Sequence, residues 1–138
     1  MRWDARGRPV GWIAAWPIYL LRFQLVVVYF YGGLRKLSPD WLAGCPAEHW
    51  FEMRAGGGPV FGGLVSASQA GLLISYGGLV FDLAIGWLLC WKKTRLAALI
   101  LLIPFHLLNS WFFQIGYFPY FMLIASIVFF DPDQPRVL

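Results

Sequence analysis

The chain has 138 residues, of which 59% are hydrophobic and only 13% charged, and its mean hydropathy is +0.63. A soluble domain of this length needs a polar surface that this composition does not supply, so an integral membrane protein is expected. The net charge of +4 falls mainly in segments that flank apolar stretches. That placement argues against a nucleic-acid-binding surface.

The hydrophobic pattern predicts an all-α integral membrane bundle of four transmembrane helices, within a single domain over residues 1–138. Ser38-Pro39-Asp40 ends the first apolar stretch, and a long loop over residues 38–66 follows it. Within this loop, Asp40 to Leu42 and Ala47 to Met53 are amphipathic enough for a short interfacial helix. The fourth stretch is short for a bilayer. The four predicted spans are residues 12–37, 67–91, 94–113 and 117–130.

The basic residues predict the orientation of these spans. They gather before the first span, in the turn between the second and third, and after the fourth, whereas the long loop carries only Arg54. Because cytoplasmic loops are enriched in Lys and Arg, the N-terminus is expected in the cytoplasm and the loop outside. The expected location is a bacterial inner membrane, with the lipid bilayer as a partner and no nucleic acid.

Five polar residues interrupt segments that are otherwise apolar. An ionisable side chain in hydrocarbon costs a few kcal/mol or more, so it is normally paired, turned toward the bundle interior, or functional. These residues are therefore the candidates for a site. They are Arg22, Lys36, Asp82, His106 and Asn109.

Arg22 and Asp82 carry opposite charges at similar predicted depths. At a helical rise of about 1.5 Å per residue, Arg22 lies roughly 15 Å from the inner end of its span and Asp82 roughly 13 Å from the inner end of its own. We therefore predict a buried ion pair between them, with locking of two helices as its first interpretation. Gly78 and Gly86 flank Asp82 and favour close helix approach.

Lys36 ends the first span, where a lysine normally extends its amine to water. However, Arg22, Tyr29 and Lys36 recur at seven-residue spacing, so they share one helix face. If Arg22 points into the bundle, Lys36 does so as well. A lysine in an apolar pocket has its ammonium form disfavoured, and the neutral amine then becomes available as a base.

His106 and Asn109 lie at i and i+3 on the outer half of the third span, and Gln114 lies near the same end. A lone histidine in such a span is often a hydrogen-bonded structural residue. Two neighbouring polar residues on one face favour a cavity lining that also includes Lys36. No metal site is predicted, because the two cysteines, Cys45 and Cys90, do not have metal-ligand spacing.

Three segments resemble a known family: YLLRFQLVVVYFYGGLRKLSPDW (Tyr19 to Trp41), GGLVFDLAIGWLL (Gly77 to Leu89) and FHLLNSWFFQIGYFPYFML (Phe105 to Leu123). In this order they resemble the membrane domain of vitamin K-dependent gamma-carboxylase. That domain and its bacterial relatives form the HTTM (horizontally transferred transmembrane) family. The resemblance covers roughly residues 19–130.

The resemblance implies a mechanism in which a lysine deprotonates vitamin K hydroquinone, or another quinol, which then reacts with oxygen to give an epoxide. In the carboxylase this step drives carboxylation of a glutamate side chain. The catalytic lysine corresponds to Lys36, and the H-x-x-N-S motif to His106, Asn109 and Ser110. The carboxylase has further helices before this region and a large lumenal domain after it. Carboxylation is therefore expected only for a longer form, and this chain is expected to be a fragment or a minimal relative.

Two alternatives stay open. DoxX-like four-helix quinone oxidoreductases are similar in having an Arg-bearing first helix that ends in a G-x-x-K-L type turn. A catalytically inert membrane module that binds a partner or lipid is the third interpretation, since a polar residue in a span can be purely structural.

Overall fold

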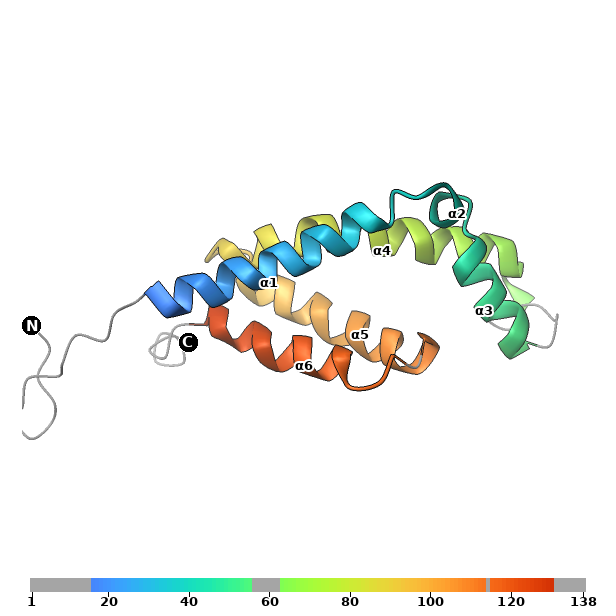
Figure 1. Ribbon diagram of the computed structural model, residues 1–138. Helices are drawn as coiled ribbons and strands as arrows, with labels where there is room; N and C mark the ends of the chain where they lie inside the picture. The colour runs from blue at the N-terminus through green and yellow to red at the C-terminus, as the bar shows by residue number, and fades with distance from the viewer. Residues whose placement is uncertain (1–15, 56–62, 114, 131–138) are drawn as a thin grey trace, which may run out of the picture.

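The computed structural model is a helical bundle whose long helices lie beside one another (Figure 1). Three long helices are followed by a short helix, α6, that continues as the 3₁₀-helix η2. The elements are α1 (Trp16–Arg35), α4 (Ala67–Cys90), α5 (Arg95–Phe113), α6 (Phe118–Ala125) and η2 (Ser126–Phe129). The residues that the structure describes are 16–55, 63–113 and 115–130.

Two short helices, α2 (Pro39–Leu42) and α3 (Cys45–Ala55), lie at the end of the bundle where α1 ends and α4 begins (Figure 1). Both fall where the sequence predicts short helical segments in the long loop. Pro39 stands in the first turn of α2, where the missing amide hydrogen costs nothing. Gly44, with a φ of 82°, makes the turn between α2 and α3 that other residues rarely adopt.

The predicted spans 67–91 and 94–113 are confirmed as helices, within one residue at each end. With α1 they are the three helices, among the described residues, that are long and apolar enough to cross a membrane. The fourth predicted span forms a helix that is shorter than the hydrocarbon core is thick. Phe118–Phe129 rises only about 20 Å, whereas the core is about 30 Å thick. The structure thus supports an integral membrane protein with three candidate spans and one shorter apolar helix.

Side chains cap both ends of α4. At its start, the Ser66 hydroxyl accepts a hydrogen bond from the Gln69 amide, and the Gln69 side chain accepts one from the Ser66 amide. This capping box satisfies two amides that no helical carbonyl can reach. At its end, Thr94 donates to the Leu88 carbonyl and Arg95 to the Leu89 carbonyl, at 2.7 and 3.0 Å. The α4–α5 turn is therefore held by the first residues of α5.

Glycines set the close antiparallel contact between α1 and α4. A Cβ on Gly33 would lie 2.6 Å from Leu83 Cδ2, and a Cβ on Gly86 would lie 3.2 Å from Val26 Cα. An added methyl group would be crowded at both points, so the two backbones approach closely, as Gly86 near Asp82 predicts. This register decides which polar groups of α1 and α4 can meet.

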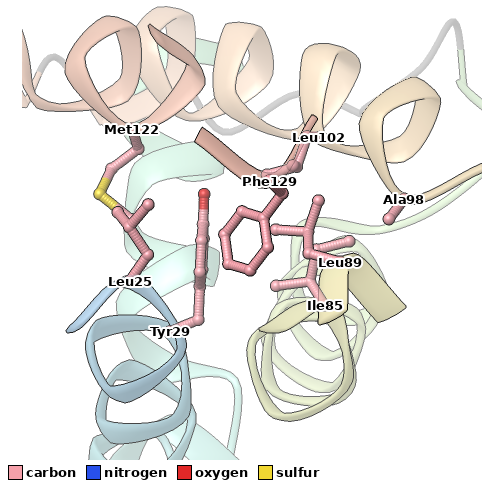
Figure 2. Packing of buried hydrophobic residues seen from close by; sticks show 8 residues of the cluster. All are labelled: Leu25, Tyr29, Ile85, Leu89, Ala98, Leu102, Met122 and Phe129. Atoms are coloured by element: carbon pink, nitrogen blue, oxygen red, sulfur yellow. The ribbon is translucent and has the colours of Figure 1, made fainter. Parts of the chain in front are cut away.

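The main apolar core lies in the half of the bundle where α1 begins and α6 ends. Figure 2 shows side chains from α1, α4, α5, α6 and η2 meeting around the Phe129 ring, with the hydroxyl of Tyr29 among them. Phe129 is fully buried, so the short last element closes the core although it does not span a bilayer. The core residues are Leu25, Tyr29, Ile85, Leu89, Ala98, Leu102, Met122 and Phe129.

Replacing Gly71 with alanine is expected to destabilise the fold, because its Cβ would lie 2.9 Å from the Glu48 amide nitrogen and the Gly44 carbonyl oxygen. These are backbone atoms of the α2–α3 segment and cannot move aside as a side chain can. We expect the free energy of unfolding to fall by about 1–3 kcal/mol. Thermal unfolding in detergent, followed by circular dichroism, measures this.

The matched control is Gly77→Ala on the same helix, where an added Cβ meets nothing within 4 Å. This variant should unfold at or slightly above the wild-type temperature, since alanine is a better helix former than glycine. Equal unfolding temperatures for the two variants would contradict the close contact at Gly71.

Candidate functional site

Lys36 and Asp82 form an ion pair inside the bundle. Lys36 follows the last residue of α1, and its ammonium group contacts the Asp82 carboxylate in the middle of α4. The two side chains are only 18% and 10% exposed. The ammonium also donates to the Gly78 carbonyl at 3.5 Å. The amine therefore points into the molecule and not into the surrounding solvent or lipid.

Two glycines make room for this pair. A Cβ on Gly32 would lie 3.2 Å from Asp82 Oδ2, and a Cβ on Gly78 would lie 3.4 Å from Lys36 Nζ. Side chains at these positions would crowd the carboxylate from α1 and the ammonium from α4. The glycines around Asp82 thus serve both helix approach and the ion pair.

The predicted ion pair between Arg22 and Asp82 is corrected by this geometry. Asp82 lies against Gly32, ten residues and about 15 Å along α1 from Arg22, too far for the two charges to meet. Arg22 Nε instead donates to the Val128 carbonyl at 2.9 Å. The depth estimate failed because it aligned the inner ends of the two spans, whereas the glycine contacts set a shifted register.

The seven-residue spacing on α1 nevertheless identifies an inward face. Arg22 contacts η2, Tyr29 contacts α5 and Lys36 contacts α4. Tyr29 Oη and His106 Nε2 are 2.9 Å apart, and both side chains are almost completely buried. Each of the three polar residues of this face therefore joins α1 to a different element.

Aromatic rings enclose the Lys36 ammonium. Nζ lies 5.2 Å from the centre of the Trp41 ring and 5.8 Å from that of Phe105, distances typical of cation–π contacts. The Trp41 indole is held in place because its Nε1 donates to the Ser75 carbonyl at 2.9 Å. Phe105 stacks on Phe81, with ring centres 3.6 Å apart. The ammonium thus lies beside two aromatic rings and one carboxylate.

The ion pair opens onto a cavity of about 390 Å³, which we call the Lys36 cavity. Its size suits a small organic molecule with one or two rings. Aromatic side chains form much of its wall, and polar groups stand at a few points only. Its lining includes Tyr29, Lys36, Trp41, Trp50, Asp82, Phe105, His106, Asn109 and Phe113.

The structure brings together most of the residues that the sequence singled out. Lys36, Tyr29, His106 and Asn109 all line the Lys36 cavity. Ser110 does not line it; its hydroxyl donates to the Tyr120 hydroxyl at 3.0 Å. Gln114 lies outside the described residues. Their roles in binding or catalysis stay predictions.

Sequence reasoning missed the aromatic wall and the partner of Lys36. Trp41 follows Lys36 by five residues, in the segment Ser38 to Trp41 that ends the first span. A turn in this segment can bring the Trp41 ring back over the Lys36 amine, so the sequence did contain a signal for this contact. Trp50 and Phe113 come from α3 and α5, and their edge-to-face contact depends on how α3 folds over the bundle. No pattern within either segment of the sequence predicts that contact.

Comparison with known families shows to which family the chain belongs. The family model described as the HTTM domain matches residues 5–134. The chain belongs to the HTTM domain family. No solved structure matches it. Among the described residues of this HTTM domain, no group of three or more His, Cys, Asp or Glu side chains is placed to hold a metal ion.

Removing one charge of the Lys36–Asp82 pair should destabilise the fold more than removing both. Asp82→Leu leaves an ammonium without its counter-ion and Lys36→Met leaves a carboxylate without one, and breaking a buried pair in this way costs about 3–5 kcal/mol. A double variant, Lys36→Met with Asp82→Leu, leaves no uncompensated charge and should lose much less. Thermal unfolding of the two single variants and the double variant in detergent gives the coupling between the residues. Additive losses would mean that the two groups do not interact.

Proposed function

We propose that this HTTM domain binds a quinol in the Lys36 cavity and removes a hydroxyl proton from it at the Lys36–Asp82 pair. The observation that carries the proposal is an ion pair facing an apolar, aromatic-lined cavity of ring size. A flat aromatic ligand would stack against the walls formed by Trp41, Trp50 and Phe105. The resemblance of the motif around Lys36 to that of the carboxylase supports the choice of a quinol.

The ion pair changes how the base would work. Lys36 is paired with the Asp82 carboxylate, so the base is the pair as a unit and not an isolated neutral amine. The quinol hydroxyl transfers its proton to the lysine nitrogen as that nitrogen passes one to the Asp82 carboxylate. The products are a neutral carboxylic acid, an ammonium group and a quinolate anion that replaces the carboxylate as counter-ion.

The walls of the cavity favour this exchange of partners. Charges attract more strongly in an apolar site than in water, so an ammonium held between Trp41 and Phe105 stabilises a new anion beside it. Asn109 lines the same cavity and can donate a hydrogen bond to a quinol oxygen. A quinolate gives up electrons to an oxidant more readily than a quinol, because it carries a negative charge, and dioxygen is the acceptor that the resemblance to the carboxylase implies.

The proposal ends at the quinol. Carboxylation of glutamate needs a site for a peptide, and no contact among the described residues supports one. The match to the HTTM family over residues 5–134 favours this interpretation over a DoxX-like oxidoreductase.

Where the variant domain remains folded by circular dichroism, Lys36→Met should abolish quinol oxidation while leaving binding largely intact. A positioned proton acceptor contributes about 10²–10⁴-fold to a rate, so we expect a loss of at least about 100-fold. The measurement is quinol consumption under air, with the domain in lipid nanodiscs. Quenching of tryptophan fluorescence by the oxidised quinone reports binding, because Trp41 and Trp50 line the cavity.

Lys93→Met is the control, since Lys93 is an exposed lysine in the α4–α5 turn. It should retain the wild-type rate. Wild-type turnover in the Lys36→Met variant would remove the base from the proposal.

A structural module without catalysis is the second candidate, and the same ion pair favours it because the pair joins α1 to α4. The two functions differ in one measurement. If the wild-type domain binds no quinone, and the uncharged double variant at positions 36 and 82 is less stable than the wild type, the pair serves the fold alone.

A further inference from the structure

A second cavity lies between α4 and α5. Its volume is about 230 Å³, compared with about 390 Å³ for the Lys36 cavity. Its lining residues are spaced by three and four along each helix, so α4 and α5 each turn one stripe toward it. We call it the α4–α5 cavity; it is defined by Leu73, Gly77 and Phe81 on α4 and by Phe105, Leu108 and Phe112 on α5.

The α4–α5 cavity is open at one end and closed at the other. A Cβ added to Gly77 would meet nothing within 4 Å, so the space beside this part of α4 is empty. Leu73 and Leu108 are 66% and 51% exposed, which places the opening on the lipid-facing surface between the two helices. The stacked rings of Phe81 and Phe105 close the cavity toward the α4–α5 turn, since they are its lining residues nearest to that turn.

The α4–α5 cavity meets the Lys36 cavity at the ion pair. The Asp82 carboxylate lines only the Lys36 cavity, whereas the lysine side chain lines both. A molecule in the α4–α5 cavity therefore lies beside the same ammonium group as a ligand in the Lys36 cavity, but it enters between different helices. The residues that line both cavities are Lys36, Trp41, Phe105, Asn109 and Phe113.

The lining and the volume of the α4–α5 cavity suit a small apolar molecule. Apart from Lys36 and Asn109, its lining consists of glycine, aliphatic and aromatic residues. Its volume falls below about 300 Å³, the lower end of the range for pockets that hold drug-sized ligands. Apolar cavities of this kind take up small apolar molecules such as xenon. Dioxygen is such a molecule, and because it is more soluble in hydrocarbon than in water, it is available at the lipid-facing opening.

We propose that the α4–α5 cavity binds dioxygen and delivers it from the bilayer to a quinolate held in the Lys36 cavity. This inference rests on the proposed function for the quinolate, whereas the binding of dioxygen depends on the α4–α5 cavity alone. The quinolate loses the electrons that dioxygen gains, so negative charge moves from the ring to the oxygen. The Lys36 ammonium lies where the two cavities meet and stabilises this charge in either place. A separate entrance lets dioxygen arrive while the quinol fills the Lys36 cavity.

Dioxygen binding is measured without any quinol, from the relaxation that this paramagnetic molecule causes in methyl groups. The domain, labelled at its isoleucine methyl groups, is studied by NMR in nanodiscs under oxygen and under nitrogen. Ile74 lines the α4–α5 cavity, whereas Ile100 is 60% exposed on the lipid-facing surface and Ile85 is 1% exposed. Oxygen should relax the Ile74 methyl group as strongly as that of Ile100, and should leave that of Ile85 almost unchanged.

Gly77→Leu and Leu108→Phe each add bulk at the opening of the α4–α5 cavity, and neither residue lines the Lys36 cavity. Each variant should lower the oxygen-induced relaxation of Ile74. Each should also lower kcat/KM for dioxygen about ten-fold, with kcat at high oxygen and quinone binding unchanged, because kcat/KM reports the capture of free dioxygen. Val80→Leu is the control, since Val80 is 64% exposed on α4 and lines neither cavity. It should match the wild type in both measurements.

Four results would overturn the proposal. Relaxation of Ile74 as weak as that of Ile85 would mean that dioxygen does not enter the cavity, and nuclear Overhauser contacts from lipid chains to Ile74 would mean that lipid fills it. Either result leaves the quinol site standing. An unchanged kcat/KM for dioxygen in both filled variants, with quinol consumption still lost in Lys36→Met, would mean that dioxygen arrives by another route. A wild-type domain that consumes no quinol would remove the proposed function and the delivery of dioxygen with it.

Discussion

The ion pair between Lys36 and Asp82 is the constraint on which the site depends. It joins the end of α1 to the middle of α4 in a region where an unpaired charge would be very costly. Gly32 and Gly78 are the positions that let the two side chains meet without obstruction. Because the pair needs this close approach, the packing of α1 on α4 and the chemistry of the cavity are set by the same contacts.

Three polar contacts hold the inward face of α1 against the rest of the bundle. Arg22 donates to the backbone of η2, Tyr29 bonds to His106 of α5, and Lys36 pairs with Asp82 of α4. Each contact satisfies a polar group that lipid would not, and each fixes α1 against a different neighbour. The apolar stripes between these contacts remain free to line cavities. These contacts fix the rotation of α1 about its own axis, although much of its surface is exposed to lipid.

Membership of the HTTM family and the geometry of the cavity account for different properties of the protein. The family assigns the architecture and the membrane setting, whereas the proposed chemistry depends on which atoms surround one ammonium group. The rings of Trp41 and Phe105 lie beside it, and the Asp82 carboxylate is its counter-ion. An ion pair of this kind can stabilise a fold or exchange its carboxylate for a ligand anion, and the shape of the space beside it is what favours the second use.

Sequence alone determined the membrane class, the positions of α4 and α5, the inward face of α1 and the gathering of Lys36, His106 and Asn109. These follow from local rules, because hydropathy sets the spans and a helical repeat sets which residues share a face. The partner of Asp82 and the wall formed by Trp41, Trp50 and Phe113 were decided only by the tertiary structure. Helix register depends on glycine contacts between segments about fifty residues apart, and the fold of α3 over the bundle depends on Gly44 and Gly71 meeting. No periodicity within one helix carries that information.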